Sequence, residues 1–117
     1  MATTEDITRL KHMLEAAQKA MYFTQDRSRR DLDADEVLTL AMVRLLEIVG
    51  EAARNISDSI KDKYPAVPWK PIAGTRDRLI HGYFDVDLDI VWQIITADLP
   101  PLTSSLEQIL HDEEGNG

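Results

Sequence analysis

Five side chains capable of chemistry lie within eight residues of this 117-residue chain: Arg76, Asp77, Arg78, His81 and Tyr83. Histidine is the side chain best suited to proton transfer near neutral pH. Arginine carries a rigid fork of donors that matches phosphate oxygens. Attack of a ribose 2′-hydroxyl on its own phosphodiester needs a proton acceptor, a group that stabilises the phosphorane charge and a proton donor. The segment therefore predicts phosphodiester cleavage, with Arg76 and His81 as the catalytic pair.

Simpler interpretations exist for each of these residues. His81 could be a helix-end histidine that interacts with the helix dipole. Arg76 and Arg78 could be solvated charges, and at most we expect Arg78 to assist phosphate binding. Tyr83 could be a packing residue with its hydroxyl at the surface.

The sequence contains few side chains that would bind a metal ion or a cofactor. There are no cysteines, which excludes disulfides, thiolate metal sites and cysteine nucleophiles. Asp85, Asp87 and Asp89 follow an i, i+2 spacing across a predicted helix start, where capping explains them better than metal binding. We expect no metal and no cofactor.

The spacing of the predicted catalytic pair limits how the two side chains can approach one another. Five positions along a helix turn a side chain by about 500°, so Arg76 and His81 would lie roughly 140° apart on a straight helix. Convergence is easier if the helix ends near His81, as Gly82 suggests. A two-fold homodimer would also bring two Arg/His sets around one cleft. We favour the homodimer.

The rest of the chain predicts helices that would position this segment. Apolar residues spaced three and four apart predict a helix from Thr4 to about Phe23, followed by a polar connection over residues 24–31. A longer helix begins at residues 33–35 and ends before Tyr64. Gly50 inside it costs about 1 kcal/mol relative to alanine, which indicates close approach of another helix. Glu51, beside it, could orient Arg76 or be a surface carboxylate.

The second half continues the helical pattern. Pro65 and Pro68 bracket a non-helical stretch, and a shorter helix is predicted from Trp69 to about His81. A last helix starts at residues 87–89, with a kink or break at Pro100, and residues 111–117 look frayed. The chain is therefore predicted to be one domain (1–117) of the all-α class, an antiparallel bundle of four to five helices.

Composition sets limits on location and partners. The N-terminus lacks the charge and apolar run of a signal peptide, and no stretch is long enough to span a membrane, so we expect a cytoplasmic protein. The net charge of −8 would repel the phosphates of a nucleic acid, so the chain as a whole does not attract RNA electrostatically. Binding of RNA would need a local basic patch or help from a partner. Residues 27–30 (RSRR) are the most basic patch and are more simply a solvated loop.

The motif and its surroundings resemble the HepT-like group of HEPN proteins. Arg76, His81 and Tyr83 fit the R-x-x-x-x-H-x-Y signature, and Asp77 supplies the polar residue usual after the arginine. Further landmarks follow in the same order along the chain, at residues 47–53 (EIVGEAA), 64–69 (YPAVPW), 81–84 (HGYF), 90–92 (IVW) and 98–100 (DLP). The likeness extends from Leu10 to Leu110.

The resemblance implies a homodimeric, metal-independent endoribonuclease toxin whose partners are RNA and a MntA-like nucleotidyltransferase antitoxin. Arg76 and His81 would be catalytic, Asp77, Arg78 and Glu51 auxiliary, and Tyr83 the residue to which the antitoxin transfers AMP. An adenylyl group there would add bulk and negative charge where an RNA phosphate must lie. Two alternatives stay open: a non-catalytic nucleotide- or partner-binding module that works with a nucleotidyltransferase, and a helical bundle with a degenerate site.

Overall fold

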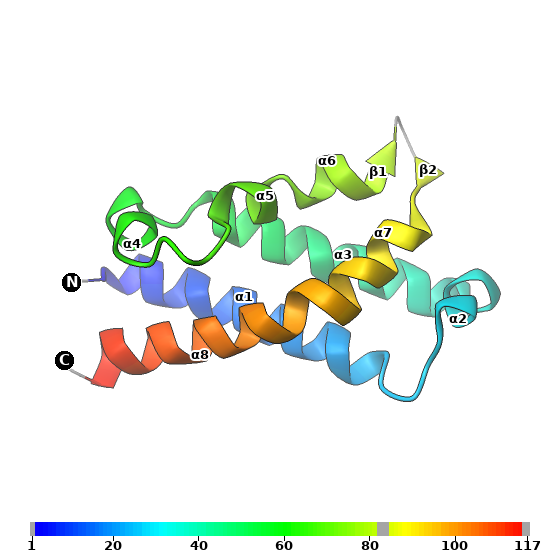
Figure 1. Cartoon of the computed structure of the whole chain (residues 1–117), viewed down its shortest axis with the longest axis horizontal. Coiled ribbons are helices and arrows are strands. Elements are labelled where there is room, and N and C mark those ends of the chain that lie inside the picture. Colours follow the sequence, from blue (N-terminus) through cyan, green and yellow to red (C-terminus); the bar gives the residue numbers. More distant parts are fainter. Residues whose placement is uncertain (1, 82–84, 116–117) are drawn as a thin grey trace.

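The centre of the fold is an antiparallel pair of long helices, α1 (Thr4–Phe23) and α3 (Glu36–Arg54), with α8 (Leu99–Gly115) packed along α1 (Figure 1). This computed structural model describes residues 2–81 and 85–115. Shorter elements complete it: α2 (Arg29–Ala34), α4 (Asp58–Lys63), α5 (Trp69–Ala73), α6 (Thr75–Leu79), β1 (Ile80–His81), β2 (Asp85–Val86), α7 (Leu88–Gln93) and η1 (Ile94–Asp98). The predicted all-α helical bundle is confirmed.

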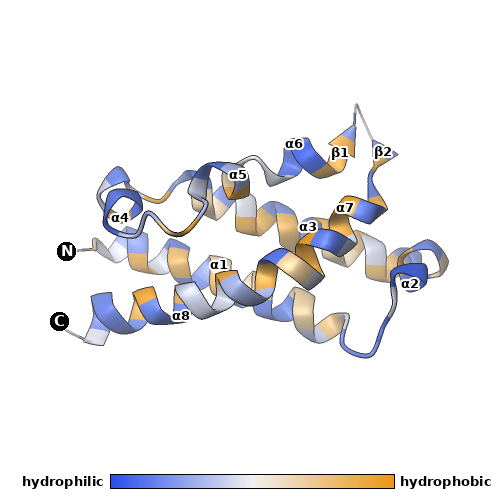
Figure 2. Ribbon diagram, in the orientation of Figure 1, coloured by the Kyte–Doolittle hydropathy of each residue, from blue (hydrophilic) through white to orange (hydrophobic). Residues whose placement is uncertain are grey.

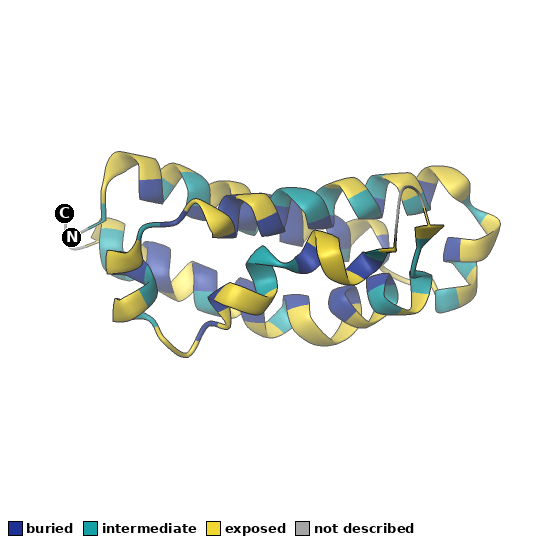
Figure 3. Cartoon of the chain, turned by 90° about the horizontal axis from the view of Figure 1, so that it is seen from above, coloured by how far each residue is buried: buried dark blue, intermediate teal, exposed yellow. Residues whose placement is uncertain are grey.

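The long helices form because each carries one apolar face. Figure 2 shows hydrophobic and hydrophilic residues on different sides of these helices, and Figure 3 shows the buried residues turned toward the interior. The core residues with no exposed surface include Leu10, Met13, Met42, Leu46 and Leu106. Among the described residues, no helix has the length and low polarity needed to cross a membrane.

The bounds of α1 and the start of α3 agree with the predicted ones. Thr3 caps α1 by accepting a hydrogen bond from the Asp6 amide, and Asp35 caps α3 by accepting from the Leu38 amide, each at 3.0 Å. The predicted connection is partly helical, because Ser28 and Asp31 form a reciprocal capping box at the start of α2.

The prediction of one helix from residues 33–35 to Tyr64 was wrong. α3 ends at Arg54, and α4 begins after its own N-cap, Ser57. The buried carboxylate of Asp6 accepts hydrogen bonds from the Ser57 amide (2.9 Å) and hydroxyl (2.7 Å). Burial raises the pKa of Asp6, but the hydrogen bonds from Ser57 and Thr3 outweigh it, so that pKa lies below its usual value. A contact between distant segments therefore ends the helix.

The sequence predicted a kink or break at Pro100, but the irregular turn lies just before it, in η1. η1 is a π-helical segment, and the chain continues from it into α8 with Pro100 and Pro101 in the first turn. A proline has no amide hydrogen and its ring clashes with a carbonyl in the preceding turn. The wider π-helical turn gives that ring room.

The C-terminal segment is ordered helix as far as Gly115, contrary to the predicted fraying of residues 111–117; residues 116–117 lie outside the described part. Glu113 anchors it. Its side chain is 2% exposed and accepts hydrogen bonds from Lys63 Nζ (2.7 Å), the Tyr64 hydroxyl and the Ala2 amide (3.0 Å). The hydrogen bonds from Lys63 and Tyr64 lower the pKa of Glu113 to about 2. Burial raises the pKa of the Tyr64 hydroxyl to about 12, and its hydrogen bond to the Glu113 carboxylate contributes to the increase.

This anchor predicts an acid-sensitive contribution to stability. The pKa of Glu113 is lower in the folded chain, about 2, than its ordinary value of 4.5 in an unfolded chain. The ionised carboxylate therefore stabilises the folded chain fully above pH 4.5, and this stabilisation is lost as the pH falls through about 2. The contribution is at most about 3 kcal/mol. Chemical denaturation at pH 7 and pH 3 should show that Glu113→Gln is less stable at pH 7 and loses less stability on acidification than the wild type.

A matched control for this experiment is Glu114→Gln. Glu114 pairs with Lys11 at the surface, where an exposed ion pair contributes about 0–1 kcal/mol. Equal pH dependence of unfolding in all three proteins would show that Glu113 does not anchor α8.

Candidate functional site

The motif arginines project from α6, a helix of about one turn held between two buried residues. Thr75 is buried at its start and donates a hydrogen bond from its hydroxyl to the Ile72 carbonyl (2.6 Å), and Leu79 is fully buried at its end. Arg76, Asp77 and Arg78 lie between these anchors and are exposed. The interior therefore fixes the helix while its charged side chains face outward.

Gly50 on α3 allows this segment to pack closely, as the sequence predicted. A Cβ atom at Gly50 would lie 3.0 Å from the Ile72 carbonyl oxygen and 3.3 Å from Thr75 Cβ. Any larger residue would push away the turn that leads into α6.

Arg76 lies beside α3 and is 71% exposed. Its Nε is 3.8 Å from Oε2 of Glu47, a half-buried carboxylate on α3. Among the described residues the carboxylate that pairs with Arg76 is Glu47, and no ion pair joins Arg76 to Glu51. Glu51 is exposed and lines a separate hollow with Arg9 and His12.

His81 lies on a short strand, although the sequence predicted the end of a helix there. β1 pairs antiparallel with β2, with His81 opposite Asp85. The Asp87 amide donates to the Leu79 carbonyl at 2.7 Å, which takes that carbonyl out of the helix and ends α6 at Leu79. Gly82, proposed as the terminator, lies outside the described residues.

The imidazole of His81 is 60% exposed and faces a carboxylate. Its Nε2 is 3.6 Å from Oδ2 of Asp87. The other oxygen of Asp87 accepts hydrogen bonds from the amides of Asp89 (3.1 Å) and Ile90 (3.2 Å) and so caps α7, as predicted. The position of this carboxylate is thus fixed by the helix that it caps.

The two predicted catalytic side chains lie beside different carboxylates within the chain. Across residues 2–81 and 85–115, no hydrogen bond or ion pair joins Arg76 to His81; each has its own carboxylate, Glu47 or Asp87. Arg78 extends in another direction, with Nη2 3.7 Å from Oδ2 of Asp98 on η1. Tyr83, the predicted modification site, lies outside the described residues. Within the described part, no cluster of three or more metal-ligating side chains is present.

Sequence reasoning missed both carboxylate partners. Glu47 could have been found, because it lies one helical turn before Gly50, the residue that admits the motif segment. Asp87 was assigned to the cap of a helix, but nothing in its spacing from His81 indicated contact. That contact depends on the β1–β2 pairing.

Comparisons with known proteins agree with the resemblance to the HepT-like group. Residues 13–109 match the family model described as "Ribonuclease HepT-like". A protein of Caldanaerobacter subterraneus subsp. tengcongensis, "Putative RNase TTE0752", is 41% identical over 90% of this chain and 94% of the relative. "Putative RNase MJ0127" of Methanocaldococcus jannaschii is 37% identical over 91% and 88%. "Probable ribonuclease HepT" of Thermococcus cleftensis is 36% identical over 86% and 91%.

No solved structure gave a significant match to the chain. The family model nevertheless spans most of the sequence, from α1 to α8, and includes the motif segment with both carboxylate partners. The chain belongs to the ribonuclease HepT-like family.

Proposed function

We propose that this chain is an endoribonuclease that cleaves RNA at Arg76 and His81 without a metal ion. The observation that carries the proposal is the exposure of both motif side chains at consecutive elements, α6 and β1, each beside one carboxylate. The names of the relatives, a putative RNase and a probable ribonuclease, support ribonuclease activity.

The chemistry follows from the two side chains. The imidazole of His81 accepts the 2′-hydroxyl proton, and the 2′-oxygen attacks phosphorus while the bond to the 5′-oxygen breaks. Arg76 donates hydrogen bonds to the phosphate oxygens, where negative charge grows. A second imidazole or a water protonates the leaving 5′-oxygen. Asp87 is a positioning residue that orients the His81 ring.

A homodimer would bring two copies of the motif together. Val37 and Leu40 are 78% and 63% exposed on α3. With Arg44 and Glu47 they follow a 3-4-3 spacing and so share one helix face. This face continues to the Glu47–Arg76 pair, so a second copy docked there would place its own motif next to that of the first.

The activity requires control, and we propose that the chain is the toxin of a toxin–antitoxin pair. The partner is a nucleotidyltransferase antitoxin that transfers AMP to Tyr83. Tyr83 is two positions from His81, so an adenylyl group would put bulk and a phosphate charge where the RNA backbone must pass.

Cleavage of RNA by the purified protein in the presence of a chelator tests the main proposal. We expect cleavage to persist when divalent ions are removed. Expression of the chain without its partner should also arrest growth. Chelator-sensitive cleavage would overturn the metal-independent mechanism, and absence of cleavage would overturn the enzyme.

The modification predicts a change in mass. After co-expression with the nucleotidyltransferase, the intact mass should rise by one or more AMP units, with the modified peptide containing Tyr83. A Tyr83→Phe chain should keep the unmodified mass and its toxicity. An unchanged wild-type mass would contradict adenylylation.

The net charge of −8 favours one competing function, that of a partner-binding module without nuclease activity. Such a module would bind the nucleotidyltransferase, cleave no RNA and be harmless when expressed alone.

A further inference from the structure

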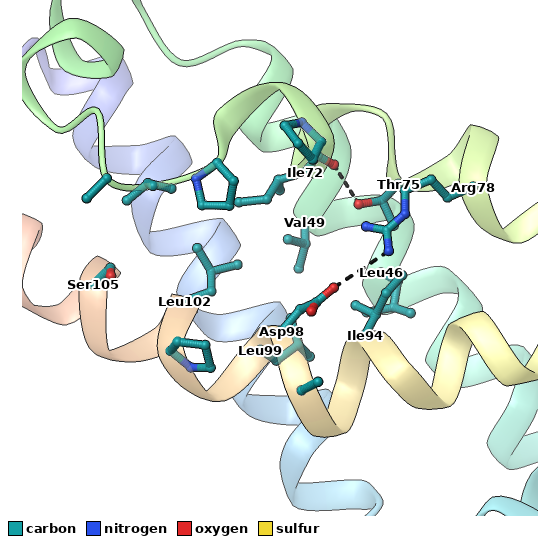
Figure 4. A pocket seen from close by; sticks show the side chains of 16 residues that line it. Leu46, Val49, Ile72, Thr75, Arg78, Ile94, Asp98, Leu99, Leu102 and Ser105 are labelled. Carbon is teal, nitrogen blue, oxygen red and sulfur yellow. Dashed lines mark hydrogen bonds and ion pairs between the residues drawn. The ribbon is translucent and has the colours of Figure 1, made fainter.

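A cavity of about 350 Å³ lies between α6 and η1 (Figure 4). Its walls come from α3, from residues 66–68 and the helices α5 and α6 that follow them, and from η1 and α8. Most are apolar, including Leu46, Val49, Ile72 and Leu102, together with three proline rings at positions 68, 71 and 101. Ligand cavities of about 300 Å³ are at the small end of the usual range, so this one has room for a single ring system.

Two charged side chains lie over this cavity. Figure 4 shows Arg78 extending from α6 toward Asp98 on η1. The 3.7 Å between Arg78 Nη2 and Asp98 Oδ2 is too long for a hydrogen bond, and both side chains are partly exposed. The guanidinium therefore retains donors, and the carboxylate acceptors, for a ligand. The Thr75 hydroxyl is already used by the Ile72 carbonyl.

The ligand that fits must be flat with apolar faces, and its edge must offer acceptors beside donors. All four RNA bases have mixed edges. Guanine alone offers two neighbouring acceptors, O6 and N7, to an arginine and two neighbouring donors, N1–H and the N2 amino group, to one carboxylate. We propose that this cavity binds a guanine base between Arg78 and Asp98, with the proline and aliphatic walls against the faces of the ring.

The source of the guanine, which rests on the proposed function, is the RNA substrate. Proteins read single-stranded RNA by extruding bases into pockets and bonding to their edges. Arg76 and Arg78 lie two positions apart on one short helix, and their carboxylate partners lie on different elements, Glu47 on α3 and Asp98 on η1. A strand whose phosphate lies at Arg76 can thus place a neighbouring base over Arg78. Arg78, predicted to assist phosphate binding, would instead select the base.

Binding of mononucleotides to the full chain by titration calorimetry tests the cavity without any cleavage. Guanosine monophosphate should bind more tightly than the adenosine, cytidine and uridine monophosphates. Asp98→Asn and Arg78→Ala should each weaken that binding by roughly tenfold or more. Ala97→Phe, at the exposed rim of the cavity, should block it sterically. Asp62→Asn makes the same change on an exposed carboxylate of α4 and should leave binding unchanged.

Mapping the cut sites in RNA distinguishes the source of the base. Guanine enriched at a fixed position beside the cut, and lost in Asp98→Asn, would support the RNA strand as the source. Tight, Asp98-dependent binding of guanosine monophosphate without such enrichment would overturn the RNA source and leave a free nucleotide as the ligand. Equal binding of all four nucleotides, or no binding, would overturn the guanine site. Arg76→Ala should abolish cleavage and leave guanosine monophosphate binding unchanged. A failure of the catalytic assignment can therefore be told apart from a failure of the guanine site.

Discussion

His81→Ala is expected to lower the rate of RNA cleavage by about 10²- to 10⁴-fold, the range that a positioned general acid or base supplies. Arg76→Ala should have a comparable effect, because the growing phosphate charge would lose its hydrogen-bond donors. Arg76→Lys should recover little, since a lysine cannot reproduce the two-pronged contact of a guanidinium. Initial cleavage rates of a labelled RNA measure all three.

Both side chains are exposed and anchor nothing in the core, so these variants should fold and melt like the wild type. His12→Ala removes a histidine from α1, outside the motif, and serves as the matched control. Equal rates in the wild type, His81→Ala and Arg76→Ala would remove the assignment of both residues.

Asp87→Asn should have a smaller effect than His81→Ala. Asparagine caps helices as well as aspartate does, so α7 is retained while the charge beside the imidazole is lost. We expect kcat to fall with KM little changed, because in the proposed mechanism Asp87 orients the His81 ring and does not contact RNA. A fall in thermal stability equal to that of Asp87→Ala would indicate a purely structural role.

The sequence predicted those features that depend on neighbouring residues. The bounds of α1 follow from its apolar spacing, and the start of α3 follows from Asp35. The close approach at Gly50 was predictable because a glycine inside a long helix is costly without a packing reason. Each of these features can be predicted from a short stretch of sequence.

The features that were not predicted depend on contacts between distant segments. The break between α3 and α4 requires Asp6, which lies 51 positions from Ser57. The end of α6 requires the Asp87 amide at the Leu79 carbonyl, and the same pairing brings Asp87 to His81. The carboxylates of the candidate site are therefore a product of tertiary structure. The motif itself was visible because both residues of the predicted catalytic pair lie within one short segment.

Leu40→Glu is expected to convert a dimer into a monomer and to abolish most RNA cleavage. Leu40 is exposed and shares its helix face with Val37, Arg44 and Glu47, so a charge there costs the folded chain little. In a two-fold dimer each substitution occurs twice, which would place two buried charges near the axis. Light scattering measures the mass, and the cleavage assay measures the consequence.

Thr8→Glu adds the same charge to the exposed surface of α1, near its N-terminus. It should keep both the dimer mass and the activity. A wild type that is monomeric at working concentrations, or a Leu40→Glu dimer of full activity, would rule out α3 as the interface.

Mixing two inactive proteins tests whether the dimer builds the site. In a mixed dimer of His81→Ala and Arg76→Ala chains, one chain supplies an intact Arg76 and the other an intact His81. If each site combines the arginine of one copy with the histidine of the other, random exchange should restore roughly a quarter of the wild-type sites. If both groups act within one chain, mixing should restore nothing, because every chain lacks one of them. Since Arg76 and His81 face separate carboxylates within the chain, we expect restoration.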